Sequence, residues 1–430
     1  MGRLSATVRF LGHLAKDLAG TLASRWRRFH RRIVLGEPVA VVGVDVFPFF
    51  ERMTGVGRYA WNLLAALDAR DGDGLEFNLY GRTFLAPEEP APPAMPGRRR
   101  MRLRVHHLPE GFLFPVRPAM AFLDGVVEPL LRILDGNDVL FAPNFFAHRT
   151  QLPYGRTVVA TIHDLAFRAM PDTVAPETLG ELARNLGPSL YRSERIVAVS
   201  EATAGDVVQC LGVPRRRIHT VHEGIDPAFC SEPGTLPEGV PGRYLLFVST
   251  LEPRKNVANV LRAFRLMVEW GYPGALVLVG RWGWRTGAIR RELENSPVRD
   301  RIVHLDYVEQ AALPALYGDA EALIFPSLLE GFGLPILEAM ACGTPVVTAG
   351  RSAMPEVAGP AAVYVDPESP HGIATGVLAL VRDPEHRRRL GEAGRERAAM
   401  FSWERAAAAT AQVLRQAAGL PPTGPDEYRV

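Results

Sequence analysis

Two glutamates, Glu330 and Glu338, enclose a glycine-containing segment in the second half of the chain. Gly331 and Gly333 allow the backbone to approach a ligand closely, and Pro335 is typical of the first turn of a helix. The backbone amides at this helix start would lack partners within the helix, which favours binding of an anion. These amides belong to Phe332, Gly333 and Leu334. Since carboxylates accept hydrogen bonds from sugar hydroxyls, the segment predicts a phosphate on the amides, with one glutamate binding a hexose and the other a ribose.

Two adjacent cations, Arg254 and Lys255, follow the apolar run 244–249 and precede a stretch with helical periodicity. Cations at a helix start oppose the helix dipole, so their presence indicates that an anion binds there. Either side chain could neutralise a leaving diphosphate. A third cation, Arg281, follows the next apolar run at 275–279 in the same manner.

Short apolar runs alternate with helical stretches from about residue 38 onward, which predicts an α/β fold with parallel sheets covered on both faces. In such sheets ligands bind beyond the carboxyl ends of the strands, where the residues above are placed. The runs expected to form strands are 39–46, 75–80, 102–106, 138–142, 157–162, 195–199, 218–221, 244–249, 275–279, 302–305, 322–325, 345–348 and 361–365.

These residues, in this order, resemble family 4 of the retaining glycosyltransferases over roughly residues 40–415. The family has the GT-B fold, in which two Rossmann-like doubly wound domains face each other across a cleft. The matching pieces are Thr-Gly-Val-Gly-Arg-Tyr (54–59), Thr-Ile-His-Asp-Leu (161–165), Leu-Glu-Pro-Arg-Lys-Asn (251–256), Leu-Val-Gly-Arg-Trp-Gly-Trp (278–284), the two glutamates, Ala-Cys-Gly-Thr-Pro-Val-Val-Thr (341–348) and Pro-Glu-Val (355–357).

The resemblance implies a role for each matching residue. Glu330 would contact the transferred sugar, Glu338 the ribose and Lys255 the diphosphate. His163 would lie at the reacting sugar and Val308 near the nucleobase. The loop over the phosphates would contain Gly55 and Gly57.

The chain departs from the family at Ser249, where many members carry an arginine six residues before the lysine. We expect Arg254 or Arg281 to supply that charge.

The segment 55–60 also fits the pattern Gly-x-Gly-x-x-Ala of dinucleotide-binding enzymes. That pattern requires the loop to follow its strand at once, and here it begins some nine residues later. The next strand ends in Tyr80, Gly81 and Arg82, without the acid that would bind a ribose. We therefore reject a bound dinucleotide and expect no cofactor. No cluster of metal ligands is visible in the sequence, so we expect no metal, with lysine, arginine and helix dipoles meeting the diphosphate charge.

The first 32 residues hold eight Lys or Arg and one acid, whereas the whole chain carries +2. Apolar residues at helical spacing, among them Leu22, Trp26, Phe29 and Ile33, form one stripe. Such a helix can lie in an anionic membrane surface. The alternatives are a stripe packed on the body of the protein and a dimer seam.

The sequence predicts four parts. They are a basic helix at 1–36, an acceptor-binding domain at 37–235, a donor-binding domain at 240–400 and a helix at 401–420 that crosses back to the first domain. No segment has the length of a membrane span or the features of a signal peptide. Three widely spaced cysteines suit a reducing compartment. We therefore expect a cytoplasmic protein, with peripheral membrane attachment through the basic helix.

The expected reaction moves a hexose, with mannose favoured, from a GDP- or UDP-sugar to a hydroxyl of a glycan or lipid-linked acceptor. The anomeric configuration would be retained, and the product would serve polysaccharide or glycolipid biosynthesis. The alternatives are a sugar-nucleotide epimerase of the same fold and a non-catalytic carbohydrate-binding protein. Nothing in the body of the chain resembles a nucleic-acid-binding face, and we expect no nucleic-acid partner.

Overall fold

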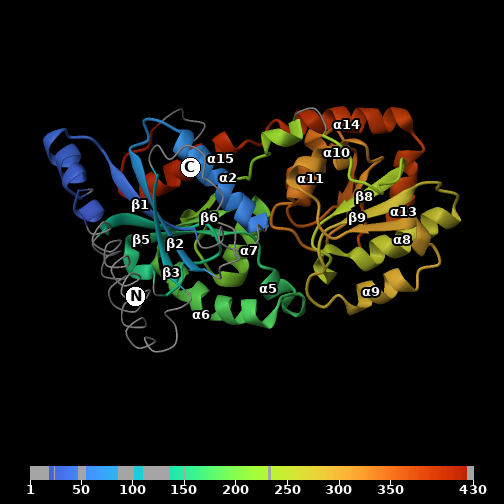
Figure 1. Cartoon of the computed structure of the whole chain (residues 1–430), viewed down its shortest axis with the longest axis horizontal. Coiled ribbons are helices and arrows are strands. Elements are labelled where there is room, and N and C mark those ends of the chain that lie inside the picture. Colours follow the sequence, from blue (N-terminus) through green and yellow to red (C-terminus); the bar gives the residue numbers. More distant parts are fainter. Residues whose placement is uncertain are drawn as a thin grey trace, which may run out of the picture.

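The computed structural model of the 430-residue chain describes residues 19–46 except Ser24, and residues 55–85, 101–109, 135–149, 151–230 and 234–423. Within the segments 81–85 and 102–109 the backbone alone is described. Two lobes lie side by side, each built on one parallel sheet flanked by helices (Figure 1). This confirms the α/β architecture of two Rossmann-like domains.

The first sheet has seven parallel strands in the order β3-β2-β1-β4-β5-β6-β7. Its strands are β1 (Ala40–Asp45), β2 (Leu75–Leu85), β3 (Met101–Pro109), β4 (Asn137–Ala142), β5 (Gly155–Ile162), β6 (Ser193–Ala198) and β7 (Ile218–Thr220). The helices of this lobe are α2 (Gly55–Ala69), α5 (Ala166–Ala169), α6 (Pro176–Arg192) and α7 (Glu201–Leu211). Strand β1 is buried almost throughout, as a central parallel strand with apolar residues on both faces should be.

The second sheet has six parallel strands in the order β10-β9-β8-β11-β12-β13. Its strands are β8 (Tyr244–Val248), β9 (Ala275–Val279), β10 (Ile302–Leu305), β11 (Leu323–Phe325), β12 (Val346–Ala349) and β13 (Ala362–Val365). The helices are α8 (Val257–Glu269), α9 (Gly287–Glu294), α10 (Leu313–Gly318), α11 (Leu334–Ala341), α12 (Met354–Ala358), α13 (Pro370–Val381) and α14 (Pro384–Ala398). The strand order reverses between β8 and β11, and ligands of doubly wound sheets bind at such a switch point.

The two lobes share one apolar core cluster, in which Phe229, Phe332, Phe401 and Trp403 lie among the strands and helices of both domains. The last helix, α15 (Trp403–Ala417), leaves the second lobe and packs on α2 and on strands of the first sheet (Figure 1). This packing fixes how the carboxyl ends of the two sheets meet.

The described part of the N-terminal segment is helical from residue 19 and continues into a π-helical turn, η1 (His30–Val34). The stripe of Leu22, Trp26, Phe29 and Ile33 is exposed, so the alternative that it packs on the body of the protein is wrong for these residues. Residues 1–18, the start of the expected helix, lie outside the described residues. No helix among the described residues is both long enough and apolar enough to span a membrane.

Candidate functional site

Lys255 and Glu330 form an ion pair at the switch point of the second sheet. Strand β8 leads through a short turn, Pro253–Lys255, into α8, whereas β11 leads through the loop containing Glu330 into α11. The two strands are neighbours, with Leu323 opposite Leu246. The Lys255 Nζ atom lies 2.7 Å and 2.8 Å from the two carboxylate oxygens of Glu330. Both side chains are almost buried, so each charge is neutralised mainly by the other.

Arg254 joins this pair and ties it to the first domain. Its guanidinium lies 3.0 Å from Glu252, 3.6 Å from Glu330 and 3.5 Å from Asp164, which follows β5. Burial alone would lower the pKa of Arg254, but the neighbouring carboxylates raise it above its ordinary value. The side chain is therefore a permanent cation. It also donates a hydrogen bond to the Leu329 carbonyl oxygen at 3.1 Å, which holds the loop before α11.

Arg281 is not part of this cluster. It follows β9, is exposed, and places its guanidinium 5.5 Å from the ring centre of Tyr307. The neighbouring Val308 is partly buried and packs against the core after β10. Of the two arginines expected to replace the charge missing at Ser249, Arg254 is the one beside Lys255.

The loop between β11 and α11 presents free amides next to the ion pair. Gly333 has φ of 109°, a conformation that favours glycine, and caps the helix that starts at Leu334. Within the described part of the chain no oxygen accepts a hydrogen bond from the amides of Phe332, Gly333 or Leu334. A Cβ at Gly331 would lie 1.5 Å from the His163 carbonyl oxygen, so only glycine fits at this contact between the domains.

Glu338 lies in the second turn of α11 and is buried. The Tyr317 hydroxyl donates a hydrogen bond to one of its oxygens at 2.7 Å, and Arg58 Nη1 lies 3.8 Å from the other. Burial raises the pKa of Glu338, although Arg58 and Tyr317 oppose the shift. The carboxylate is thus held in place at an energetic cost, as is common at functional sites.

Gly55 and Gly57 open helix α2 of the first domain; Gly55 is exposed and Gly57 is buried. The next residue, Arg58, extends from this helix start to Glu338 in the second domain. The structure therefore brings the helix start of α2 close to that of α11.

His163 lies at the end of β5 and is nearly buried. Its Nε2 atom is 2.8 Å from the Pro143 carbonyl oxygen, which can only accept, so Nε2 carries the proton. Its Nδ1 atom faces Glu223 at 3.7 Å, and Tyr59 packs edge-on against the ring with 4.7 Å between ring centres. The ring is positioned firmly, and its backbone carbonyl contacts the loop that carries Glu330.

Sequence reasoning missed three residues of this site: Glu223, Arg58 and Asp164. Glu223 is buried and follows β7, and it acts on Glu338 as well as His163. The rule that functional residues follow strands could have found Glu223 and Asp164. Arg58 could have been found as a cation in the first turn of a helix, the same signal that identified Lys255.

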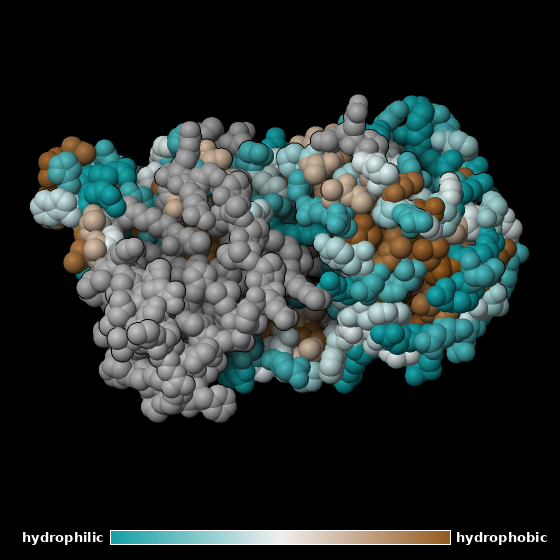
Figure 2. All heavy atoms as spheres, viewed as in Figure 1, coloured by the Kyte–Doolittle hydropathy of each residue, from teal (hydrophilic) through white to brown (hydrophobic). Residues whose placement is uncertain are grey.

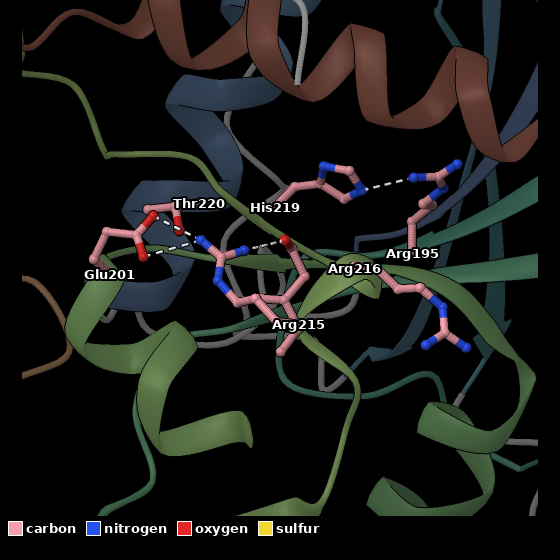
Figure 3. A pocket seen from close by; sticks show the side chains of 7 residues that line it. Arg195, Glu201, Arg215, Arg216, His219 and Thr220 are labelled. Carbon is pink, nitrogen blue, oxygen red and sulfur yellow. Dashed lines mark hydrogen bonds and ion pairs between the residues drawn. The ribbon is translucent and has the colours of Figure 1, made fainter. Parts of the chain in front are cut away.

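A separate hollow of roughly 480 Å³ lies on the first domain and contains none of the residues expected from the sequence (Figure 3). Arg215 pairs with Glu201 at 2.9 Å, and Arg195 donates to His219 at 3.1 Å. Burial, assisted by Arg195 and Arg215, lowers the pKa of His219 to about 4, which keeps that ring neutral. The residues that line this hollow are Arg195, Glu201, Arg215, Arg216, Ile218, His219 and Thr220.

Two protein families match adjacent parts of the chain. Glycosyltransferase Family 4 matches residues 53–229, and Glycosyl transferases group 1 matches residues 235–397. Together they contain all the site residues described above.

Individual proteins are similar over much of the chain. The O-antigen chain mannosyltransferase B of Escherichia coli is 29% identical over 82% of this chain and 93% of its own length. The MMP alpha-(1->4)-mannosyltransferase of Mycolicibacterium hassiacum is 35% identical over 52% of this chain and 54% of its own. The structure of sucrose-phosphate synthase from Thermosynechococcus elongatus superimposes with a TM-score of 0.64 at 20% identity, covering 88% of this chain and 98% of that one.

Proposed function

Because the chain belongs to the family 4 glycosyltransferases with the GT-B fold, we propose that it transfers mannose from GDP-mannose to an acceptor hydroxyl, with retention of configuration. The choice of mannose is supported by the names of the two mannosyltransferases above, one of which matches 82% of this chain. The acceptor is a glycan or a lipid-linked sugar in polysaccharide or glycolipid biosynthesis, made on the cytoplasmic side of a membrane.

The observation that carries this proposal is the ion pair of Lys255 and Glu330 beside three free amides. A diphosphate bound beside Lys255 would offer its ammonium two negative charges, in place of the single charge of the Glu330 carboxylate. Glu330 would then be free to accept hydrogen bonds from hydroxyls of the transferred sugar. The amides at the start of α11 would bind phosphate oxygens, as helix N-termini do.

Charge that develops on the leaving diphosphate is stabilised by Lys255, by Arg254 and by the same amides. The bond between the anomeric carbon and the phosphate oxygen breaks while the acceptor oxygen bonds to that carbon from the same face. The acceptor proton moves to the departing phosphate oxygen, so the step needs no covalent intermediate on the protein. Glu338, which accepts a hydrogen bond from the buried Tyr317 hydroxyl, would bind the ribose.

Two measurements test the proposal. In a thermal-shift screen of GDP- and UDP-sugars, GDP-mannose should raise the melting temperature most, because a ligand that binds only the folded state stabilises it. Product analysis, with and without a chelator, should then show GDP and an α-linked mannoside at unchanged rates. A donor converted into its epimer without an acceptor, or a β-linked product, would refute the reaction as written.

A further inference from the structure

The N-terminal helix is attached to the first domain by its basic face. Arg28 donates a hydrogen bond to the Asp135 carbonyl oxygen, and Arg32 pairs with Asp138. Arg31 lies 2.7 Å from Glu76, the second residue of β2. The helix thus uses three of its arginines to bind its own domain.

These contacts fix which side of the helix faces outward. The exposed side carries four apolar residues at helical spacing, and Val34 and Leu35 extend it. We call this set the apolar ridge. The ridge residues, between 52% and 69% exposed, are Leu22, Trp26, Phe29, Ile33, Val34 and Leu35. The rings of Trp26 and Phe29 stack with 5.9 Å between their centres. The ridge appears as brown atoms at the left tip of Figure 2, at the end of the molecule away from the second lobe.

We propose that the apolar ridge inserts into the interface of an anionic phospholipid membrane and holds the enzyme there. Tryptophan and phenylalanine beside exposed cations form the combination that binds lipid interfaces, since the rings enter the acyl boundary while the cations meet the headgroups. Arg25, Arg27 and His30 are exposed next to the ridge. Because Arg28 and Arg32 hold the helix against the domain, the ridge stays outward without any rearrangement.

The charge of the helix argues against a second copy of the chain as the occupant. The sequence has no acidic residue between positions 19 and 35. Two copies meeting ridge to ridge would therefore bring only cations together, and like charges at an interface are costly. An anionic lipid surface complements the same cations, each worth about 1 kcal/mol near such a surface.

The test uses the full chain and two double variants, each of which replaces two exposed large side chains by serine. The first, Trp26→Ser with Phe29→Ser, removes the rings of the ridge. The second, Tyr191→Ser with Met400→Ser, removes exposed apolar side chains elsewhere and serves as the control. Deletion of the whole segment is a poorer test, because it would also leave Asp135 and Asp138 without their arginines.

Co-sedimentation is measured with vesicles of phosphatidylcholine alone and with vesicles that also contain phosphatidylglycerol. The wild type and the control should bind the anionic vesicles, and the ridge variant should bind them at least about tenfold more weakly. Arg25→Glu with Arg27→Glu should abolish the preference for anionic vesicles. Sugar transfer to a water-soluble acceptor should stay unchanged in all variants, so this test is independent of the proposed reaction.

Three outcomes would overturn the proposal. The wild type could fail to bind anionic vesicles, or the ridge variant could bind them as well as the wild type. Analytical ultracentrifugation could also show a wild-type dimer that the ridge substitutions dissociate, with vesicle binding unaltered; the ridge would then be a contact between two copies of the chain.

Discussion

Of the 49 basic residues in this chain only two are lysines, Lys16 and Lys255. Arginine serves nearly everywhere else, so the lysine at the switch point is not an interchangeable cation. A lysine ammonium is a compact charge on a flexible stem, whereas arginine is a planar fork that suits fixed bidentate contacts. Lys255 must leave Glu330 to meet a diphosphate, which requires this mobility. Arg254, bound to carboxylates of both domains, needs to stay in place.

Removal of either partner of the ion pair should impair the reaction. We expect Lys255→Ala and Glu330→Ala each to lower the turnover number by about a hundredfold or more, which is the effect of losing one group that stabilises developing charge. Lys255→Arg should lose about tenfold or more, because its fork cannot reproduce the lysine contact. Initial rates with saturating donor measure these effects.

Arg262→Ala and Glu292→Ala are the matched controls, since these residues form a 2.9 Å ion pair on the surface of the same domain. Both should keep wild-type rates. Wild-type turnover in Lys255→Ala would show that the diphosphate does not bind beside Lys255.

Glu338 gives a prediction about pH. Because burial raises its pKa in the folded chain, the folded state binds more protons than the unfolded state just above the ordinary pKa of glutamate. The free energy of unfolding therefore falls as pH rises from the ordinary pKa of glutamate to the raised pKa of Glu338. Glu338→Gln cannot ionise, so the variant does not lose this stability. We expect the variant to melt about 2 °C or more above the wild type at neutral pH, with no difference below about pH 4.

The same variant should bind the sugar nucleotide more weakly, because the neutral amide is a poorer acceptor for ribose hydroxyls. Melting curves between pH 4 and 8, with and without nucleotide, measure both effects. A variant less stable than the wild type at neutral pH would mean that Glu338 serves the fold rather than the ligand.

The sequence predicted the site residues that lie on one domain better than those that meet across the two. Lys255 and Glu330 each follow a strand of the same sheet, so the strand pattern marked both residues. Their strands, β8 and β11, are brought together by the order of the sheet. Arg58 and Glu338 belong to different domains and are 280 positions apart, and no local pattern encodes how the domains face each other. The run before Glu223 was expected to form a strand, but no local pattern shows that this side chain faces His163, which lies 60 positions earlier.

At the scale of elements, each run expected to form a strand coincides with one in the structure, since buried parallel strands are apolar on both faces. Strand β2 continues five residues past the expected end at Tyr80. The described part of the expected N-terminal helix is helical, and its apolar stripe is exposed. The contacts that attach it to the first domain were not predicted. The acids of the sheet that bind Arg31 and Arg32, Glu76 and Asp138, lie 45 and 106 positions away, and their placement depends on the tertiary fold.

Glu356 joins a helix of the second domain to a helix of the first. It lies within α12 and caps the start of α7. Its carboxylate accepts hydrogen bonds from the amides of Glu201 and Ala202 at 2.8 Å and 3.2 Å, and lies 2.5 Å from His222 Nε2. Burial would raise the pKa of Glu356, but His222 and the two amides lower it below its ordinary value. The contact therefore stabilises the closed domains at neutral pH and is lost as the pH falls through that pKa.

Glu356→Gln should weaken closure by about 1 kcal/mol, the value of a partly exposed charge-assisted contact. We expect its radius of gyration in small-angle X-ray scattering to exceed that of the wild type at neutral pH. The wild type should expand on acidification, whereas the variant should change less. The control is Glu368→Gln, which alters a surface pair with Arg351 in the same domain. Equal radii for variant and wild type at neutral pH would rule out a role of this cap in closure.

The whole molecule is closed along the seam between the domains. A shared apolar core, the contact of Arg254 with Asp164 and the contact of Gly331 with His163 all join the two lobes. Lys255 and Glu330 lie near this seam, and closure of the lobes over a bound donor would exclude water from the reaction. The ion pair of Lys255 and Glu330 keeps both charges satisfied until the donor arrives.

A crystal structure of the chain with a nucleoside diphosphate sugar tests this account most directly. We predict that Lys255 Nζ has left Glu330 for a phosphate oxygen, that the amides of Phe332, Gly333 and Leu334 bind the same diphosphate, and that Glu330 contacts the sugar. A donor bound elsewhere, with Lys255 still 2.7 Å from Glu330, would contradict the account.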